Sequence, residues 1–331
     1  MRVVLPLAGY GKRMRPQTWS KPKPLVSVAG KPILGHVLDT LQATSPDSYI
    51  FITGWLGDQV REYMATAHPE LTTRYVVQEE LRGQAHAIYL AKEWLEGPTL
   101  IVFVDTLFQG DMRGLGHDGE DGIIWTKEVP DPRRFGVVVV KDDRITRFVE
   151  KPATMEHRQA IIGAYWVRDA QALVRATETL MASGRSLRGE YYLADALQVM
   201  VDQGARFVTR PVSVWEDCGN PEALLHTQRY LLEHGHAREV PVEDAILVPP
   251  VHVADGAVIK RSVVGPYVSV GSGATIEDSV IQDAVIESGA TVRYQVLANS
   301  LVGHQATLQG DVQSVNIGDN AVLESRTNVA L

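Results

Sequence analysis

The N-terminal end of the chain carries positive charge that could bind phosphate. The first 38 residues contain seven basic side chains and no acidic one, whereas the whole chain of 331 residues has a net charge of −8. An apolar run over residues 3–7 is followed by the sequence GYGKR at residues 9–13. Glycines after a strand let backbone N–H groups approach an anion, and adjacent cations neutralise its oxygens. The sequence predicts a polyphosphate site here, with a solvated basic loop as the alternative.

The elements that would hold this loop alternate between strand and helix. Short apolar runs are typical of buried parallel strands, and helical spacing separates them. The expected strands are Val3–Leu7, Tyr49–Thr53, Arg74–Val77 and Thr99–Val104, and the expected helices are Ile33–Leu41, Asp58–Ala67 and Gln84–Trp94. This order predicts an α/β, doubly wound, Rossmann-like sheet. In such sheets ligands bind beyond the carboxyl ends of the strands, so the loops after the first, third and fourth strands are where we expect chemistry.

The middle of the chain extends this sheet. Residues 122–167 are rich in strand-forming segments, and helical stretches follow near 170–181, 192–203 and 221–234. We interpret these segments as an elaboration of the same domain, which we expect to cover residues 1–236.

The C-terminal part, residues 237–331, has a different periodicity. Single aliphatic residues recur mostly in steps of five or six, at Val264, Val270, Ile276, Ile281, Ile286, Val292, Leu297, Val302, Leu308, Ile317 and Leu323. This is a hexapeptide solenoid period, in which the aliphatic side chains point inward and Gly, Ser and Ala turn the corners. We expect four or five coils of about 18 residues, the coil length of the left-handed parallel β-helix that this part resembles. A generic all-β domain is the alternative.

The N-terminal string LAGYGKRMRPQTWSKPKPLVSVAGKPI resembles the signature of the nucleoside-diphosphate-sugar pyrophosphorylase family. That signature has a G-x-G-x-R-x-x-P-x-T loop, then a lysine in K-P-L, then G-K-P. Long members of the family also end in a hexapeptide β-helix, so the resemblance covers essentially the whole chain. It implies that the nucleotide is held by Leu7, Ala8, Gly9 and Gly11. It also implies that Arg13 assists the departure of pyrophosphate and that Lys23 contacts the reacting phosphates.

Further segments resemble other elements of the family. VVQEELRGQAHA resembles the base-recognition stretch, which implies that Gln78 reads the nucleobase and that Gly83 allows close approach of the backbone. IVFVDTLFQG and WEDCGNPEALL resemble the two metal-binding elements, which makes Asp105 and Asp217 the expected Mg²⁺ ligands. A turn or helix cap is the alternative for Asp217.

The segment VEKP resembles the family's sugar-phosphate element. The resemblance implies that Glu150 binds sugar hydroxyls and that Lys151 meets the phosphate, while Gly136 and Gly163 line the sugar pocket. An exposed charge pair is the alternative for the first two residues.

Two positions depart from the family pattern. Val104 precedes the metal aspartate where the family usually has glycine, which puts the metal geometry or the substrate preference in doubt. Gln84 stands where relatives often carry Thr or Leu, so base preference cannot be transferred from the family.

The resemblance implies a sugar-1-phosphate nucleotidylyltransferase that makes an NDP-sugar and pyrophosphate from a nucleoside triphosphate and a sugar 1-phosphate. The expected pair is dTTP or UTP with glucose 1-phosphate. Cys218 has no evident activating partner and no Ser-His-Asp pattern is apparent, so we expect direct attack without a covalent intermediate. One alternative is a bifunctional enzyme with an acetyltransferase site on the β-helix. Another is a catalytically weak regulatory subunit that binds a nucleotide sugar.

Charge and cysteine content bear on partners and location. The acidic balance argues against nucleic acid or anionic membrane as a partner. A single cysteine excludes an intramolecular disulfide and favours a cytoplasmic location. An end coil with an uncovered apolar core favours association, so we expect a homo-oligomer in which the β-helix is a structural and assembly module.

Overall fold

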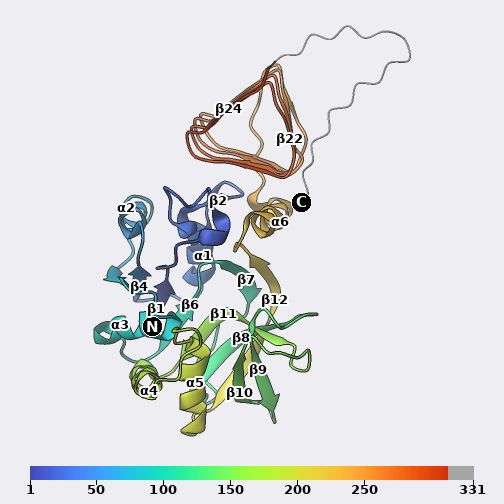
Figure 1. The fold of residues 1–331 in the computed structure, drawn as a ribbon. Coiled ribbons are helices and arrows are strands. Elements are labelled where there is room, and N and C mark those ends of the chain that lie inside the picture. Colours follow the sequence, from blue (N-terminus) through green and yellow to red (C-terminus); the bar gives the residue numbers. More distant parts are fainter. Residues whose placement is uncertain (312–331) are drawn as a thin grey trace.

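The computed structural model describes residues 1–311, which form a mixed sheet flanked by helices and then a triangular solenoid (Figure 1). The ten strands of the sheet are β1 (Arg2–Pro6), β4 (Ser48–Thr53), β5 (Thr73–Val77), β6 (Thr99–Val102), β7 (Thr106–Gly110), β8 (Gly122–Glu128), β9 (Gly136–Lys141), β10 (Arg144–Glu150), β11 (Gln159–Val167) and β12 (Phe207–Asp217). Their order is β5-β4-β1-β6-β11-β8-β12-β7, with β9 joining β11 and β10 pairing with β9.

The helices that accompany the sheet are α1 (Ile33–Gln42), α2 (Gly57–Ala67), α3 (Gln84–Leu90), α4 (Ala170–Ala182), α5 (Leu193–Asp202) and α6 (Pro221–Leu231). Short helices lie at η1 (Lys12–Met14), η2 (Lys23–Leu25), η3 (Lys92–Trp94) and η4 (Leu232–His236), and β2 (Ser27–Val28) pairs with β3 (Lys31–Pro32).

The predicted doubly wound sheet is confirmed, because β5, β4, β1 and β6 are parallel neighbours joined through helices. Among these first strands and helices, most boundaries shift by one residue and two differ from the expectation by more. β6 ends at Val102, where its ladder with β11 stops next to Gly163, a residue with a φ of 89° at an irregularity of β11. The helix expected over Gln84–Trp94 ends at Leu90, where the chain tightens into a 3₁₀ turn.

The two faces of the sheet bury separate cores. Val3 and Leu5 point to one face and Val4 to the other, as the two-residue period of a strand requires. Helices α1, α2 and α6 cover the first face, and α3, α4 and α5 cover the second. Apolar side chains pack on both faces of the sheet and hold the ends of its strands in place. The loops that leave these ends, which form the site, are therefore held in place as well.

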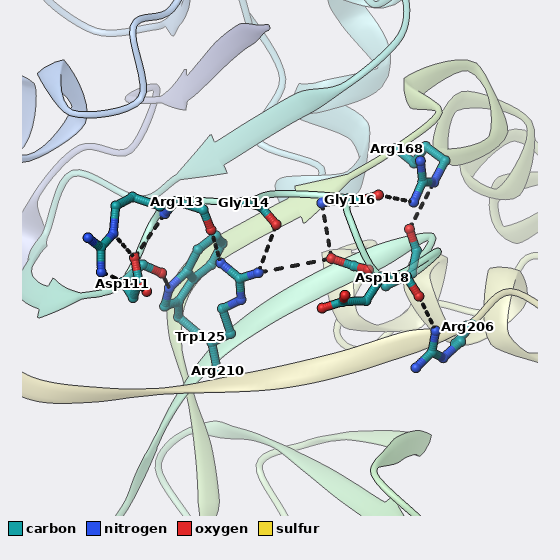
Figure 2. A network of polar contacts seen from close by, with 10 residues as sticks. Asp111, Arg113, Gly114, Gly116, Asp118, Trp125, Arg168, Arg206 and Arg210 are labelled. Atoms are coloured by element: carbon teal, nitrogen blue, oxygen red, sulfur yellow. Dashed lines mark hydrogen bonds and ion pairs between the residues drawn. The ribbon is translucent and has the colours of Figure 1, made fainter.

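The connection between β7 and β8 is held by arginines from other strands (Figure 2). Arg168 donates to the carbonyl oxygens of Gly116 and Glu120 at 2.8 and 2.9 Å, and Arg210 donates to those of Arg113 and Gly114. These bonds satisfy loop carbonyls that no ladder reaches. The middle segment is thus an extension of one sheet, as expected.

The C-terminal part is the predicted left-handed β-helix of hexapeptide repeats. Its three parallel four-stranded sheets are β13 (Ile246–Leu247), β16 (Val263–Val264), β19 (Val280–Ile281) and β22 (Val296–Leu297); β14 (Val251–Val253), β17 (Val268–Val270), β20 (Ala284–Ile286) and β23 (Ser300–Val302); β15 (Val258–Lys260), β18 (Thr275–Glu277), β21 (Thr291–Arg293) and β24 (Thr307–Gln309). Paired positions are 17 or 16 residues apart, as in Val263↔Val280 and Val280↔Val296, rather than about 18.

Most of the predicted inward positions are buried. They are Val264, Val270, Ile276, Ile281, Ile286, Val292 and Val302, with Leu297 packed at the edge of the same core. Leu308 is 36% exposed, because within the described residues its coil has a neighbouring coil on one side only. Ile317 and Leu323 lie outside the described residues.

Glycine with a positive φ turns one of the three corners, at residues 256, 273 and 289, and one position of a second corner, at residue 265. Residues with side chains turn the others, for example Asp278 and Tyr294, whose φ angles are 49° and 54°. Backbone bonds between coils hold this conformation, since the Asp278 amide donates to Lys260 and the Tyr294 amide to Glu277. The expectation that Gly, Ser and Ala turn the corners therefore describes only part of them.

Within residues 1–311, no helix is both long enough and apolar enough to cross a bilayer.

Candidate active site

Two adjoining cavities lie beyond the carboxyl ends of the parallel strands, where the sheet topology predicts ligand binding. The first has a volume of about 420 Å³, and its lining includes Leu7, Ala8, Gly9, Gly11, Arg13, Lys23, Gln78, Gly83 and Asp105. The second has a volume of about 730 Å³, and its lining includes Arg13, Asp105, Gly136, Glu150, Lys151, Gly163 and Asp217. Every residue expected at the site therefore lines one cavity or both.

The loop after β1 owes its shape to glycine. Gly11 has a φ of 60°, and a Cβ there would lie 3.1 Å from side-chain carbons of both Thr18 and Lys23. The Thr18 hydroxyl donates to the Gly11 carbonyl at 2.9 Å, which closes the loop. At Gly9 a Cβ would meet no atom within 4 Å, so this position opens directly onto the first cavity. The backbone here leaves room for a bulky anion.

The two aspartates are neighbours on adjacent strands. Asp105 directly precedes β7, and Asp217 ends β12, where it pairs with Thr106. The Cys218 amide also donates to the Asp105 carbonyl at 3.0 Å, which locks the two strand ends together. Both carboxylates consequently face the second cavity, although they are 112 residues apart in sequence.

Cations accompany these carboxylates. The Lys23 Nζ lies 3.1 Å from Asp105 Oδ2, and the Lys23 side chain is 15% exposed. The Arg13 guanidinium lies beside Gly219, next to Asp217, because a Cβ at Gly219 would be 3.4 Å from Arg13 Nη2. Where the two cavities meet, a cation thus lies near each of the two carboxylates. Such a mixture of charges can bind phosphates through the cations and a metal ion through the carboxylates.

Val104 sits in this region without backbone strain. Its side chain is 5% exposed and belongs to the core on the first face of the sheet, while it also borders the first cavity. It is not among the positive-φ residues of the described chain, so this position does not require glycine.

The amide of Gln78 has a fixed orientation. Its nitrogen lies 3.2 Å from the Gly83 carbonyl, which can only accept a hydrogen bond, and 3.3 Å from His86 Nδ1. Burial and the nearby charge of Arg82 lower the pKa of His86, which favours the neutral ring with Nδ1 as an acceptor. Gly83 itself has a φ of 95°, and a Cβ there would overlap the backbone of Tyr191. Among residues 1–311, no group donates a hydrogen bond to the Gln78 oxygen, so this oxygen remains an available acceptor.

The second cavity is lined by the carboxylate of Glu150 and the amine of Lys151, and the carboxylate is the more buried of the two. Burial raises the pKa of Glu150, and the charge of Lys151 opposes this shift. The Lys151 Nζ lies 3.6 Å from Glu150 Oε1 and 3.5 Å from the hydroxyl of Tyr192. A Cβ at Gly136 would be 2.8 Å from Glu150 Oε2, so only glycine leaves this carboxylate in place.

Several lining residues were missed from the sequence. Glu190, Gln84 and Phe103 border both cavities, and Tyr192 and Trp215 border the second. Glu190 follows a turn glycine in a loop before α5, and a single acid in such a loop has no distinctive spacing. Gln84 had been noted only as a departure from the family pattern.

The fold and the two cavities define a nucleotide-binding transferase domain followed by a β-helix. Residues 3–234 match the model of the nucleotidyl transferase family, and residues 236–294 match that of the GlmU-like C-terminal hexapeptide. The chain belongs to the nucleotidyl transferase family.

Comparison with individual proteins shows which members of this family the chain is similar to. The chain is 26% identical to a glucose-1-phosphate thymidylyltransferase of Streptomyces griseus, over 97% of this chain and 98% of that one. It is 27% identical to the bifunctional protein GlmU of Methanococcus maripaludis, over 78% of this chain but only 62% of that protein. A crystal structure of UDP-glucose pyrophosphorylase with UDP-glucose shares the fold, with a TM-score of 0.62, 20% identity, and coverage of 70% of this chain and 98% of that one.

These likenesses and the site establish the chain as a sugar-1-phosphate nucleotidylyltransferase, whose substrates are a nucleoside triphosphate and a sugar 1-phosphate. Nucleotidyltransferases of this family generally use a divalent metal ion. Within residues 1–311 there is no cluster of three or more His, Cys, Asp or Glu side chains. The fit to a divalent ion therefore depends on the carboxylates of Asp105 and Asp217, which lie at neighbouring strand ends and border the second cavity, because hard cations accept one or two carboxylates completed by phosphate and water oxygens.

Proposed function

We propose that the chain joins glucose 1-phosphate to dTTP or UTP, with Mg²⁺ as the metal. The observation that carries this proposal is the meeting of the two cavities at Arg13 and Asp105, which border both. A triphosphate in the first cavity and a sugar phosphate in the second would bring their phosphates together there. The names of a thymidylyltransferase relative and of a UDP-glucose pyrophosphorylase with the same fold support this choice of substrates.

The reaction needs positioning and charge neutralisation. A phosphate oxygen of the sugar 1-phosphate attacks the α-phosphorus of the nucleotide, a new P–O bond forms, and the α–β anhydride bond breaks to release pyrophosphate. The attacking oxygen is already ionised at neutral pH, so no general base is required. Lys151 aligns the attacking phosphate, and Arg13 and Lys23 neutralise the leaving and transferring groups.

Asp105 and Asp217 would hold the Mg²⁺ ion. An ion held by these two carboxylates would supply positive charge to neutralise the phosphates. Two carboxylates without nitrogen or sulfur ligands favour a hard cation over zinc. The Lys23 ammonium beside Asp105 keeps that carboxylate in place when no phosphate is bound.

The orientation of Gln78 supports a uracil or thymine base. Its free oxygen can accept from the N3–H of these bases, whereas N3 of cytosine is itself an acceptor and would oppose it. Guanine also carries a ring N–H donor, so GTP is the competitor that the assay must include.

Pyrophosphate release with dTTP, UTP, GTP and CTP, each with a panel of sugar 1-phosphates, tests the proposal. We expect turnover with dTTP or UTP and glucose 1-phosphate, and its loss in Asp105→Asn and Asp217→Asn. Asp142→Asn, in the exposed turn between β9 and β10, is the matched control. Turnover within a few-fold of wild type in both site variants would contradict the metal assignment.

We propose that the chain has the nucleotidylyltransferase activity alone, without a second active site on the β-helix. The two histidines of the β-helix region serve other contacts: His252 Nδ1 lies 3.0 Å from the His236 carbonyl, and the exposed His304 lies 2.9 Å from the Ser288 hydroxyl. Acetyl-CoA turnover by the full chain would show instead that the bifunctional alternative is correct.

We further propose a homo-oligomer that forms through one face of the β-helix. Ile246, Val263, Val280 and Val296 stack in register on this face, and Val280 and Val296 are 47% and 83% exposed. Covering such a ladder removes apolar surface from water. Val296→Lys should therefore lower the mass measured by light scattering. Unchanged mass would exclude this face.

Residues 1–236 and 237–331 remain the proposed domains, with 312–331 outside the described structure. A cytoplasmic location remains our expectation, because the one cysteine is suited to a reducing compartment.

A further inference from the structure

The segment that carries two catalytic cations rests on the β-helix. Residues 12–28 run from the glycine loop to β2 and present Arg13 and Lys23 to the first cavity. In Figure 1 the solenoid lies next to β2 and α6. The segment makes contact there through residues that do not line either cavity.

Glu287, which follows strand β20 of the β-helix, is the centre of this contact. Its side chain is 4% exposed, although it is a carboxylate. Oε2 forms an ion pair with the Lys21 ammonium, and Oε1 accepts a hydrogen bond of 3.1 Å from the backbone N–H of Ser27. Nearby, the Gln17 amide donates to the Leu301 carbonyl at 3.1 Å. The three partners Gln17, Lys21 and Ser27 all belong to the segment 12–28.

Two of these residues, the partners of Glu287, lie on either side of Lys23 in the sequence. Lys21 lies two residues before Lys23, and Ser27 lies four residues after it. Both ends of the 3₁₀ turn η2 that carries Lys23 are therefore fixed to one buried carboxylate. Burial of a charge is costly unless it is paired and hydrogen-bonded, and here both oxygens of Glu287 have partners. These contacts restrain the chain on both sides of Lys23.

The β-helix also contacts the N-terminal domain at residues other than Glu287. Arg229 of α6 donates to both oxygens of Asp283, and the Gln228 amide donates to the Tyr267 and Ala284 carbonyls at 2.9 Å each. Asp283 is 16% exposed, so its ion pair is also partly buried. These contacts join the solenoid to α6, whereas Glu287 joins it to the segment that lines the first cavity.

We propose that Glu287 is a positioning residue for nucleotidyl transfer. Through Lys21 and Ser27 it holds the segment 12–28 so that Arg13 and Lys23 face the reacting phosphates. The β-helix then contributes to turnover as well as to assembly. This inference rests on the proposed reaction, because it assigns Glu287 an effect on that reaction's phosphate-binding residues.

The test compares two ion pairs that join the β-helix to the N-terminal domain. Glu287→Gln keeps the shape of the side chain and an acceptor for Ser27, but it removes the charge that binds Lys21. Asp283→Asn is the matched control at the contact with α6. Steady-state rates with the full-length chain give kcat and KM for each substrate, and thermal unfolding gives the change in Tm for both variants.

We expect Glu287→Gln to lower kcat about tenfold or more, because small displacements of positioned groups cost that much in rate. The KM for the sugar 1-phosphate should change less than threefold, since strands outside the segment carry Glu150 and Lys151. Asp283→Asn should lower Tm while kcat stays within twofold of wild type. Lys21→Met should reproduce the kcat defect, and combining it with Glu287→Gln should add little further loss.

Hydrogen exchange supplies a readout that does not depend on turnover. The Ser27 amide should exchange faster in Glu287→Gln, and its exchange should be unchanged in Asp283→Asn. This distinguishes a wrong reaction assignment, in which wild type is inactive but the exchange result holds, from a wrong positioning role.

Two outcomes would overturn the inference. One is a kcat within twofold of wild type in Glu287→Gln and Lys21→Met, and the other is an equal kcat loss in Asp283→Asn. If Glu287→Gln does not fold, Lys21→Met decides alone, since Lys21 is the more exposed partner at 21%.

Discussion

His36 should make the N-terminal domain sensitive to mild acid. It lies on α1 with 5% exposure, and its Nε2 donates to the Val28 carbonyl at 2.9 Å. Its ring packs edge-on against His236, with the ring centroids 4.9 Å apart. Burial lowers the pKa of His36 from 6.5 to about 4, helped by the charges of His236 and Lys31 and opposed by the Val28 hydrogen bond and Asp39. The folded protein thus keeps this ring neutral.

The size of the effect follows from the two pKa values. A lowered pKa in the folded state means that the stability contribution is complete above pH 6.5 and is lost as the pH falls towards 4. At pH 5 the unfolded chain binds a proton at this histidine and the folded chain does not. The free energy of unfolding should therefore be about 2 kcal/mol lower at pH 5 than at pH 7 from this residue alone.

Urea unfolding followed by tryptophan fluorescence measures this loss in the relevant domain, because all six tryptophans precede residue 237. We expect the free energy of unfolding of His36→Gln to fall about 2 kcal/mol less between pH 7 and pH 5 than that of wild type. His304→Gln, at an exposed β-helix position, should follow wild type. Parallel losses in wild type and His36→Gln, or an NMR titration of His36 near pH 6.5, would refute the reasoning.

Two further predictions concern the residues that line the two cavities. Lys151→Ala should chiefly raise the KM for the sugar 1-phosphate, whereas Lys23→Ala should lower kcat with both substrates saturating; identical kinetic defects would contradict separate roles. Because burial raises the pKa of Glu150, ionisation of this carboxylate costs stability as the pH rises above about 4.5. Glu150→Gln should therefore gain Tm relative to wild type at pH 7 but not at pH 4, while it weakens use of the sugar phosphate, and an equal Tm difference at both pH values would oppose this explanation.

Local patterns predicted the grouping of the site residues. Arg13, Gln78 and Asp105 each follow a parallel strand, and the carboxyl ends of such strands meet at one edge of a sheet. Asp217 reached the same edge because β12 pairs with β7, a pairing that apolar periodicity alone does not specify. The place of Asp217 in the site was predicted instead from the resemblance of WEDCGNPEALL to an element of the family.

Contacts between distant segments were not predictable in this way. Tyr192 enters the second cavity because α5 packs near β10, and Trp215 enters from β12. Glu287 looks like an ordinary polar position of a hexapeptide repeat, and its burial arises only where the solenoid meets the segment 12–28. Similarly, the left-handed backbone at Asp278 and Tyr294 depends on backbone hydrogen bonds between coils. The conformational preferences of single residues do not predict such bonds.

The valine before Asp105 finally bears on whether the chain is an enzyme or a regulatory relative. The family that the sequence resembles usually has glycine there, and a position that required left-handed backbone would have been distorted by Val104. The structure has no such requirement: Val104 lacks a positive φ, packs in the core, and leaves the Asp105 carbonyl bonded to the Cys218 amide. Asp105 therefore keeps its place beside Asp217. What the side chain does change is the wall of the first cavity, so we expect it to affect which nucleotide fits there and not the proposed metal ligands Asp105 and Asp217.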